Sequence, residues 1–183
     1  MPTFILQVQT TLDGYMAGPD GQMDWMTMPW SDDVGEYIGG VMGPVDRLVL
    51  GRRLAEGFIP HWAAGPEGEP QESIDFMNRT PKTVITRTLT ASPWPNATVA
   101  NEPAAAVDAM KGAGGGDILA YGGATLVASL IEQRLLDELH LFVNPVAIGA
   151  GKPVFPTTAR TDFERVAVTP FACGITAVHL ARA

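Results

Sequence analysis

One stretch near the middle of the chain constrains the fold more than any other. A short apolar run, 118–121, leads through Gly122-Gly123 into residues 126–131, whose apolar side chains recur at the spacing of one helix face. Glycine at such a corner lets an outside group approach N–H donors that the first helical turn cannot pair internally. Those donors and the helix dipole favour an anion. The stretch therefore predicts a buried strand running into a helix, at a corner that either binds a phosphate or merely turns the chain.

A second corner of this kind carries two arginines. The strand-like run 46–50 is followed by Gly51-Arg52-Arg53 and a helical pattern, and Arg87 stands just past a third strand-like run. Arginine suits bidentate recognition of phosphate, and two arginines at a helix start oppose the helix dipole unless a ligand compensates. The alternative is a pair of solvated side chains. Because ligands bind beyond the carboxyl ends of parallel strands, we expect these corners to converge on one crevice.

Strand-like runs alternate with helical patterns along most of the chain, and two further runs close it. These runs cover residues 4–10, 46–50, 81–86, 97–100, 118–121, 138–143, 163–169 and 175–180. The alternation predicts an α/β fold with a mixed, mostly parallel central sheet, helices on both faces and a C-terminal antiparallel hairpin. A chain of 183 residues fits a single domain spanning 1–183.

Several local signals set the boundaries between these elements. Ser31 is expected to cap a helix that Gly39-Gly40 and Gly43-Pro44 end, and Asn101 to cap a helix reaching Lys111. The segment 15–30 is rich in methionine, tryptophan, glycine and proline. A long loop with so many apolar side chains is expected either to close over a flat ligand or to cover one end of the core.

Charge and rare residues exclude several classes of protein. The net charge of −8 argues against a nucleic-acid or anionic-membrane surface, since both need clustered positive charge. A single cysteine, Cys173, permits no internal disulfide, and His61, His140 and His179 show no metal-ligand spacing. We therefore expect no metal site, and we expect His140 to be structural. The chain has no apolar run of about 18 residues and no signal-peptide pattern, so a soluble, cytoplasmic protein is expected.

The order of motifs resembles a known family over nearly the whole chain. The motifs occupy residues 11–21, 50–53, 84–89, 121–124 and 136–155. In this order the sequence is similar to proteins with the dihydrofolate-reductase-like fold, and within that fold it resembles the riboflavin-biosynthesis reductase family, of the RibD C-terminal domain type. The resemblance implies a dihydrofolate-reductase-like fold and NADPH as the cofactor.

Cofactor-binding positions follow from the resemblance, motif by motif. It implies that the pyrophosphate is held by Gly122, Gly123, Ala124 and Thr125. It implies that Gly51, Arg52 and Arg53 meet the phosphates, that Thr86 and Arg87 meet the adenosine 2′-phosphate, and that the backbone at Met16 and Ala17 meets the nicotinamide amide. An arginine-lined pocket would favour NADPH over NADH because only NADPH carries the extra phosphate.

A reductase must also deliver a proton to the heteroatom as hydride reaches carbon. Asp13 is the first candidate, as a raised-pKa acid or as the holder of a water molecule, although it equally fits a turn closed with Gly14. Asp33 and Glu36 are second candidates. In dihydrofolate reductase a carboxylate binds the pterin from the helix after a Met-Pro-Trp-like segment, and the corresponding position here is Gly35.

These features predict an NADPH-dependent reductase of a pyrimidine- or pterin-like heterocycle, most specifically 5-amino-6-(5-phosphoribosylamino)uracil. One alternative is dihydrofolate reductase activity, which Gly35 disfavours. Another is a non-catalytic nucleotide- or flavin-binding module, which shares the crevice but needs no hydride acceptor. A small-molecule substrate and a homodimer formed through the later strands are the expected partners.

Overall fold

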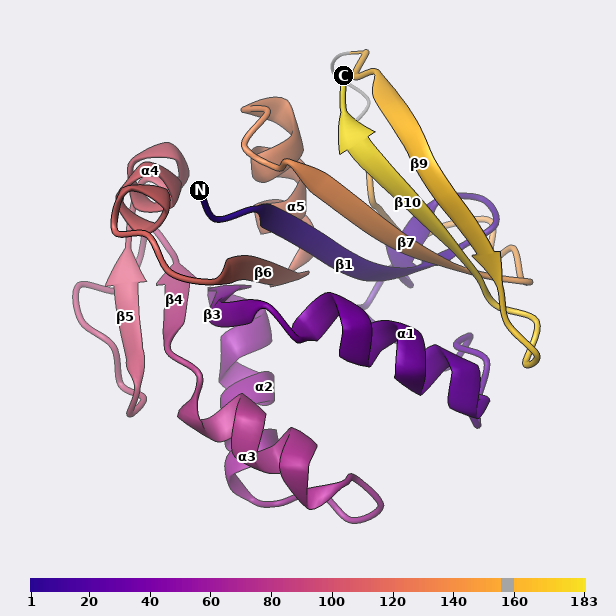
Figure 1. The fold of residues 1–183 in the computed structure, drawn as a ribbon, viewed down its shortest axis with the longest axis horizontal. Coiled ribbons are helices and arrows are strands. Elements are labelled where there is room, and N and C mark those ends of the chain that lie inside the picture. The colour runs from indigo at the N-terminus through magenta and orange to yellow at the C-terminus, as the bar shows by residue number, and fades with distance from the viewer. Residues whose placement is uncertain (156–159) are drawn as a thin grey trace.

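The computed structural model describes residues 1–155 and 160–183 and is organised around one eight-stranded sheet (Figure 1). The strand order is β5-β4-β3-β6-β1-β7-β10-β9. Every neighbouring pair from β5 to β7 is parallel, whereas β10 pairs antiparallel with both β7 and β9. The mostly parallel sheet and the antiparallel C-terminal hairpin predicted from the sequence are both confirmed.

The strands are short to medium in length, and most helices connect them. The strands are β1 (Phe4–Thr11), β2 (Tyr15–Ala17), β3 (Val45–Gly51), β4 (Lys82–Ile85), β5 (Ala97–Ala100), β6 (Asp117–Gly122), β7 (Glu138–Asn144), β8 (Lys152–Pro153), β9 (Phe163–Pro170) and β10 (Thr176–Arg182). The helices are α1 (Asp32–Met42), α2 (Arg52–Ala63), α3 (Gln71–Arg79), α4 (Pro103–Gly112) and α5 (Ala124–Glu132). None of the helices in the described ranges is long and apolar enough to cross a membrane.

Helices cover both faces of the sheet, as expected (Figure 1). The helices α4 and α5 pack on one face, where Val107, Val127 and Leu130 join a core with the side chains of β1, β6 and β7. On the other face, α1, α2 and α3 supply apolar residues that meet Ile5, Leu48 and Leu119. Alternate residues of a strand point to opposite faces, so the almost wholly buried pattern of β1 reflects a strand covered on both sides.

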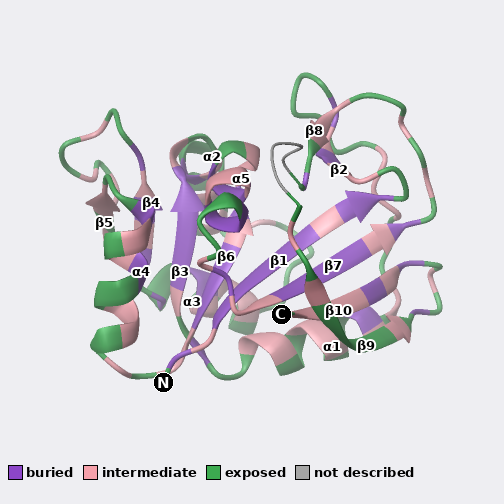
Figure 2. Cartoon of the chain, turned by 90° about the horizontal axis from the view of Figure 1, so that it is seen from above, coloured by how far each residue is buried: buried purple, intermediate pink, exposed green. Residues whose placement is uncertain are grey.

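The N-terminal strand β1 lies inside the sheet between β6 and β7, and Figure 2 shows it as largely buried. The C-terminal hairpin is different, because most of β9 is exposed (Figure 2). β9 is the terminal strand of the sheet and has a strand partner on one side only. The first strand of the chain is therefore central, and the late strands form an exposed edge.

One predicted helix end is confirmed at the second of its two glycine signals, and one predicted helix cap is wrong. Glycines 39–40 lie inside α1, which continues to Met42 because Val41 and Met42 pack against the core beneath them, and Gly43 is the C-cap as the Gly43-Pro44 signal predicts. Packing of an apolar face outweighs the roughly 1 kcal/mol that a helical glycine costs. Asn101 does not cap α4, whose cap position is Glu102. The Asn101 side chain instead donates a hydrogen bond to the carbonyl of Thr86, 2.8 Å away.

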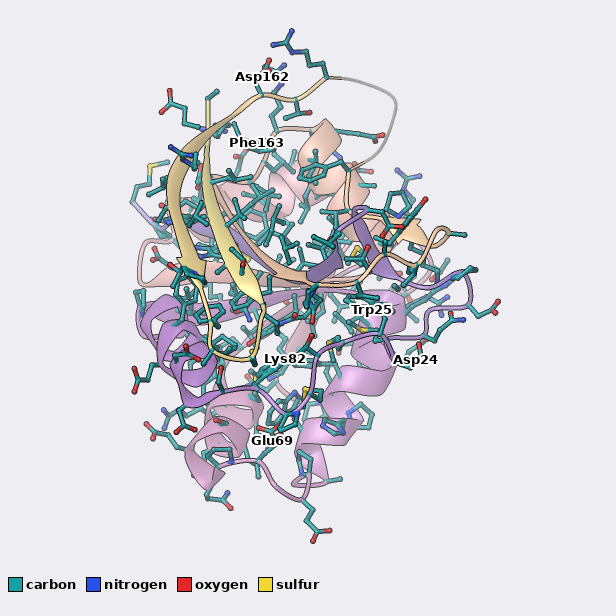
Figure 3. The ribbon with its side chains drawn as sticks, turned by 90° about the vertical axis from the view of Figure 1, so that its right-hand side faces the viewer. Asp24, Trp25, Glu69, Lys82, Asp162 and Phe163 are labelled. Carbon is teal, nitrogen blue, oxygen red and sulfur yellow. The ribbon has the colours of Figure 1, made fainter. Side chains whose placement is uncertain are left out.

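The segment 15–30 begins with a short strand and continues as a loop past the carboxyl end of β7, where the Thr27 amide contacts Asn144. β2 pairs antiparallel with β8 in a separate two-stranded ladder, which ties residues after β1 to residues after β7. In Figure 3, Asp24 and Trp25 of this loop lie on the side of the molecule away from the β9–β10 hairpin. Trp25 is half-buried, and its Nε1 is buried without a hydrogen-bond partner among the described residues.

Candidate functional site

Three chain corners with glycine or arginine meet at one edge of the sheet. Gly51 is in register with Ile85, and Leu50 is in register with Gly122, so β3, β4 and β6 end side by side. These are carboxyl ends, where ligands bind in open α/β sheets. Figure 2 shows the loops and helix starts that follow these strands gathered along the upper edge of the sheet. The prediction that these separated corners converge at one edge of the sheet therefore matches the structure.

The corners after β3 and β6 pack backbone against backbone. A Cβ atom added to Gly51 would lie 3.7 Å from the Cα of Gly123 and 3.4 Å from the Cβ of Leu126. Gly123 has a φ angle of 83°, and Gly122 has one of 119°, a region that side chains disfavour. The glycines bring two helix starts together while leaving a corner without side chains.

Both of these helices begin without a side-chain cap. The cap positions are Gly51 for α2 and Gly123 for α5, and neither can supply a hydrogen-bonding side chain to the first turn. First-turn N–H groups of an uncapped helix remain available to an anion. Ala124 and Thr125 form the first turn of α5, and Thr125 is exposed. This donor set fits the pyrophosphate of a dinucleotide.

The two arginines at the start of α2 are placed differently. Arg52 forms an i,i+4 ion pair with Glu56, at 2.7 Å between Nη1 and Oε1, whereas the Arg53 side chain is exposed. An exposed i,i+4 pair contributes only about 0.3–0.5 kcal/mol, so it opposes little of the attraction that an anion would exert on Arg52. Both residues remain near the corner that Gly51 makes.

Thr86 and Arg87 lie just beyond β4. The buried Thr86 hydroxyl accepts a hydrogen bond from the Thr88 amide at 3.1 Å, and the Thr86 carbonyl accepts one from Asn101. These bonds hold the turn after β4. Arg87 follows Thr86 at the same edge of the sheet and is exposed.

The backbone at Met16 and Ala17 approaches the same edge from β2. A Cβ atom on Gly122 would lie 3.1 Å from Cε of Met16, whose side chain is 7% exposed. Met16 therefore fastens β2 directly to the glycine corner of β6. Across the ladder, a Cβ on Gly151 would lie 2.3 Å from the carbonyl oxygen of Ala17, so glycine is required at 151 for this approach.

Asp13 closes a turn with its carboxylate fully engaged. Its Oδ1 accepts from the Thr11 hydroxyl at 2.6 Å, and its Oδ2 accepts from the amides of Gly149 at 2.7 Å and Ile148 at 3.1 Å. The Thr11 hydroxyl, followed by the two amides, lowers the pKa of Asp13 below its usual value, despite an opposing effect of burial. The expectation of a raised-pKa acid at Asp13 is thus not supported, because these donors stabilise the charged form.

Asp33 and Glu36 are not brought together with the glycine corners. Asp33 accepts from the Ser31 hydroxyl and from the Ala172 amide at 2.9 Å, and the first of these contacts lowers its pKa below the usual value. It therefore fastens α1 to the β9–β10 turn. Glu36 lines a cavity of about 430 Å³ that also borders Pro44 and Asp117, at the amino ends of the strands. Glu36 thus faces the opposite edge from Gly51.

A second cavity, of about 160 Å³, also lies away from the corners, between α5 and the C-terminal strands. It is bordered by Leu130, Arg134, Phe163 and Arg182. Neither cavity borders Gly51 or Gly123. The assignment of a dinucleotide site to the corners therefore depends on the glycine backbone, the uncapped helix starts and the neighbouring arginines.

Comparison with known proteins gives the family. Residues 2–177 match the RibD C-terminal domain. The chain belongs to the RibD C-terminal domain family. Among curated proteins of Bacillus subtilis (strain 168), YyaP is 30% identical over 175 residues, which cover 93% of this chain and 90% of YyaP. The riboflavin biosynthesis protein RibD of Corynebacterium ammoniagenes is 27% identical over 82% of this chain, but only 45% of RibD is covered.

Solved structures share the fold of this RibD C-terminal domain protein. A putative riboflavin biosynthesis protein from Shewanella sp. PV-4 superposes with a TM-score of 0.79 and 20% identity, covering 99% of both chains. A deaminase/5-amino-6-(5-phosphoribosylamino)uracil reductase from Thermotoga maritima gives a TM-score of 0.70 and 16% identity over all of this chain and 57% of the other. These likenesses confirm the dihydrofolate-reductase-like fold.

Asn144 holds the 15–30 loop in place, a role that sequence reasoning did not identify. It is fully buried at the end of β7, where its Oδ1 accepts from the Thr27 amide at 2.9 Å. Its Nδ2 donates to Oε1 of Gln9 at 2.8 Å and to the carbonyl of Phe142 at 3.1 Å. Asn144 thus anchors the 15–30 loop to β1 and β7. The sequence signal was only an Asn-Pro strand break, which does not reveal a partner 117 residues away.

Proposed function

We propose that this protein is an NADPH-dependent reductase of a pyrimidine- or pterin-like heterocycle, with 5-amino-6-(5-phosphoribosylamino)uracil as the first substrate to test. The observation that carries the proposal is the packing of Gly51 against Gly123, with Thr86 and Arg87 after the neighbouring strand. Membership of the RibD C-terminal domain family supports it, since a similar fold occurs in a named uracil reductase.

Each corner would have its own part in holding the dinucleotide. The amides at the start of α5, from Ala124 and Thr125, would receive the pyrophosphate, together with the backbone of Gly122 and Gly123. Arg52 and Arg53 would neutralise the phosphates. Arg87, with the Thr86 turn, would discriminate the 2′-phosphate of NADPH from the free hydroxyl of NADH.

NADPH would supply the hydride, and the protein would align it and exclude water. The Met16 contact with Gly122 places the β2 backbone where it would meet the nicotinamide amide. The half-buried Trp25 and the other apolar side chains of the 15–30 loop would cover the heterocycle. Because the carboxylates of Asp13 and Asp33 both have lowered pKa values, we propose that the proton comes from water and that Asp13 sets the shape of the turn.

The direct test is a fluorescence titration of the full chain with NADPH and, separately, with NADH. Binding of NADPH at least tenfold tighter than NADH supports a 2′-phosphate site, whereas equal affinities contradict it. NADPH oxidation is then followed with the uracil substrate, dihydrofolate and a flavin. Turnover of the uracil compound supports the reductase proposal, and turnover of dihydrofolate alone would favour dihydrofolate reductase. No oxidation with any of the three would favour the non-catalytic module.

We further propose that the protein is a homodimer formed through β9. This strand is one of the two terminal strands of the sheet, and Val166 and Val168 on it are 56% and 51% exposed. An unprotected edge with exposed branched apolar residues is a template for pairing, and a two-fold copy is the commonest partner for such a surface.

A further inference from the structure

Two histidines and a glutamate meet on the face of the sheet that α1 covers. Glu138 and His140 are two residues apart on β7, so their side chains point to the same face. His179 of β10 is in register with His140. The ligand-type atoms of the three side chains all lie within 4.8 Å of one another.

Glu138 and His179 are hydrogen-bonded in this structure, and the distances within the cluster also match the spacing of donor atoms around one metal ion. Oε2 of Glu138 lies 2.9 Å from Nε2 of His179 and 3.7 Å from Nε2 of His140. Donor atoms around a tetrahedral Zn²⁺ stand roughly 3.3 Å apart, given bonds of about 2.0–2.1 Å. The two measured distances bracket that value, so the Glu138 oxygen already stands between two imidazole nitrogens at nearly the required spacing.

His140 is held by its other ring nitrogen. Oη of Tyr37, from α1, lies 2.7 Å from Nδ1 of His140. Such a contact leaves Nε2 directed to Glu138 and fixes the ring. Metal-binding histidines are characteristically oriented in this way by a partner on the nitrogen that does not bind the metal. Tyr37 itself is packed between Phe142 and Phe171 at edge-to-face angles, so the support is rigid.

The cluster opens onto the cavity of about 430 Å³ beneath α1. Glu36, Asp117 and Glu138 line this cavity, and its described lining includes no lysine or arginine. The local field is therefore negative and favours a cation. The space would admit water or a small ligand to the remaining coordination positions, which is the pattern of an open metal site.

We propose that Glu138, His140 and His179 form a binding site for a divalent transition metal ion of the Zn²⁺ type. A set of two imidazoles and one carboxylate selects Zn²⁺, Co²⁺ or Ni²⁺ over Mg²⁺ or Ca²⁺, which prefer oxygen alone. The two rings now stack, with centroids 4.1 Å apart and planes 18° apart. Metal binding requires the His179 ring to rotate so that the lone pair of its ring nitrogen points at the ion that Glu138 and His140 also bind. His179 is the less buried of the pair and adjoins a register shift in the β9–β10 pairing.

This site is separate from the proposed dinucleotide edge. Its cavity borders Pro44, which precedes β3, and Asp117, the first residue of β6, whereas the glycine corners lie at the other ends of those strands. The metal would therefore fasten β7 and β10 to each other beneath α1 and would take no part in hydride transfer. Its expected effect is on stability and on the fixed position of α1.

The test uses the full-length chain after treatment with a chelator and removal of the chelator. Zn²⁺ is titrated by calorimetry, and Co²⁺ is titrated with its visible absorption as the reporter of coordination. We expect one ion per chain, intense absorption typical of fewer than six ligands, and a higher Tm with Zn²⁺. Absence of saturable binding at millimolar metal overturns the proposal.

Two variants and a control make the assignment specific. His179→Gln removes one ligand at the partly exposed position and is expected to weaken Zn²⁺ binding by more than roughly tenfold, and Tyr37→Phe by roughly tenfold or more. His61→Gln, at an exposed position on α2, is expected to leave the affinity unchanged. Wild-type affinity in His179→Gln, or loss of binding in His61→Gln, shows that the metal binds elsewhere. A wild-type circular dichroism spectrum of each metal-free variant confirms that it is folded.

Discussion

A Cβ atom placed on Gly123 would lie 3.6 Å from the Cα of Gly51, so the corners after β6 and β3 meet with almost no space between their backbones. The contact joins two segments that are 72 positions apart in the sequence (123 minus 51). It also sets the spacing of two uncapped helix starts. The first prediction tests this contact directly.

Gly123→Ala is expected to lower the free energy of unfolding by about 1–2 kcal/mol, because the φ of 83° is unfavourable for any residue with a Cβ. NADPH affinity is expected to fall as well, since the first amides of α5 shift. Urea unfolding and the NADPH titration measure the two effects. The matched control is Gly35→Ala, at an exposed position on α1 where a Cβ would meet nothing within 4 Å. It is expected to stabilise by about 0.5–1 kcal/mol, and a loss of NADPH affinity there would contradict the assignment.

Arg87→Ala is expected to weaken NADPH binding about tenfold to a hundredfold while leaving NADH binding unchanged. A hydrogen bond to a charged group contributes about 1.5–3 kcal/mol, and only NADPH carries the 2′-phosphate. The fluorescence titration gives both constants. Arg79→Ala provides the control, because Arg79 is an exposed arginine at the opposite end of β4. Equal losses for both cofactors in Arg87→Ala would place this guanidinium elsewhere on the dinucleotide.

Asn144→Ala is expected to destabilise the protein by about 2–4 kcal/mol, because the Thr27 amide and the Gln9 side chain both lose their partner in a buried place. Chemical denaturation measures the change. The 15–30 loop should also become a substrate for limited proteolysis. Asn78→Ala, which removes one exposed side-chain bond to the Trp62 carbonyl, is expected to cost less than about 1 kcal/mol. Unchanged protease resistance in Asn144→Ala would show that other contacts hold the loop.

Asp13→Asn tests whether this carboxylate pins a turn or donates a proton. The folded pKa of Asp13 is lowered, so its ionised form stabilises the protein. That contribution is complete above the ordinary pKa of 3.8 and is lost as pH falls through the lower folded value. We expect the variant to be less stable than the wild type at neutral pH, with the difference shrinking below about pH 4. Urea midpoints across this range measure it.

The same variant separates the two roles kinetically. A turn role predicts that kcat keeps its pH profile near neutrality, because no raised pKa is removed. Loss of turnover with NADPH affinity retained, together with a vanished acid limb in the kcat profile, would restore Asp13 as the proton donor.

Val168→Lys is expected to convert the proposed homodimer into a monomer, since a charge would be buried at the β9 edge. Analytical ultracentrifugation reports the mass. Thr125→Lys, at an exposed position in the first turn of α5, should leave the mass unchanged. A monomeric wild-type protein, or a dimeric Val168→Lys variant, would exclude pairing through this strand.

The features predicted correctly from the sequence were those that depend on residues close together in the chain. The strand-to-helix corner at Gly122-Gly123 combines a short apolar run, two glycines and a helical repeat within 14 residues (118–131), and each signal concerns near neighbours in the chain. The mostly parallel character of the sheet followed from the alternation of strands and helices. The hairpin followed from two β-rich runs joined by a proline and glycine turn.

The features that sequence reasoning missed depend on which strands become neighbours. His140 and His179 show no metal-ligand spacing, yet the β7–β10 register places their rings in contact. From the sequence, Asn144 indicates only the end of a strand, because its partner Thr27 becomes a neighbour only in the folded protein. The motif leaves Asp13 open as an acid, as the holder of a water molecule or as a turn residue, because it does not reveal the three donors that surround the carboxylate. Residues 156–159, between β8 and β9, lie outside the described chain.

The short ladder between β2 and β8 couples the stretch after β7 to the glycine corner after β6. Lys152 and Pro153 pair with the strand that carries Met16 and Ala17, and a Cβ on Gly122 would lie only 3.1 Å from Cε of Met16. Under the proposed function, sequence change in the 148–155 region would therefore alter the fit of the nicotinamide and of the substrate together. Relatives that change their substrate but keep the same cofactor are then expected to conserve the geometry of this ladder.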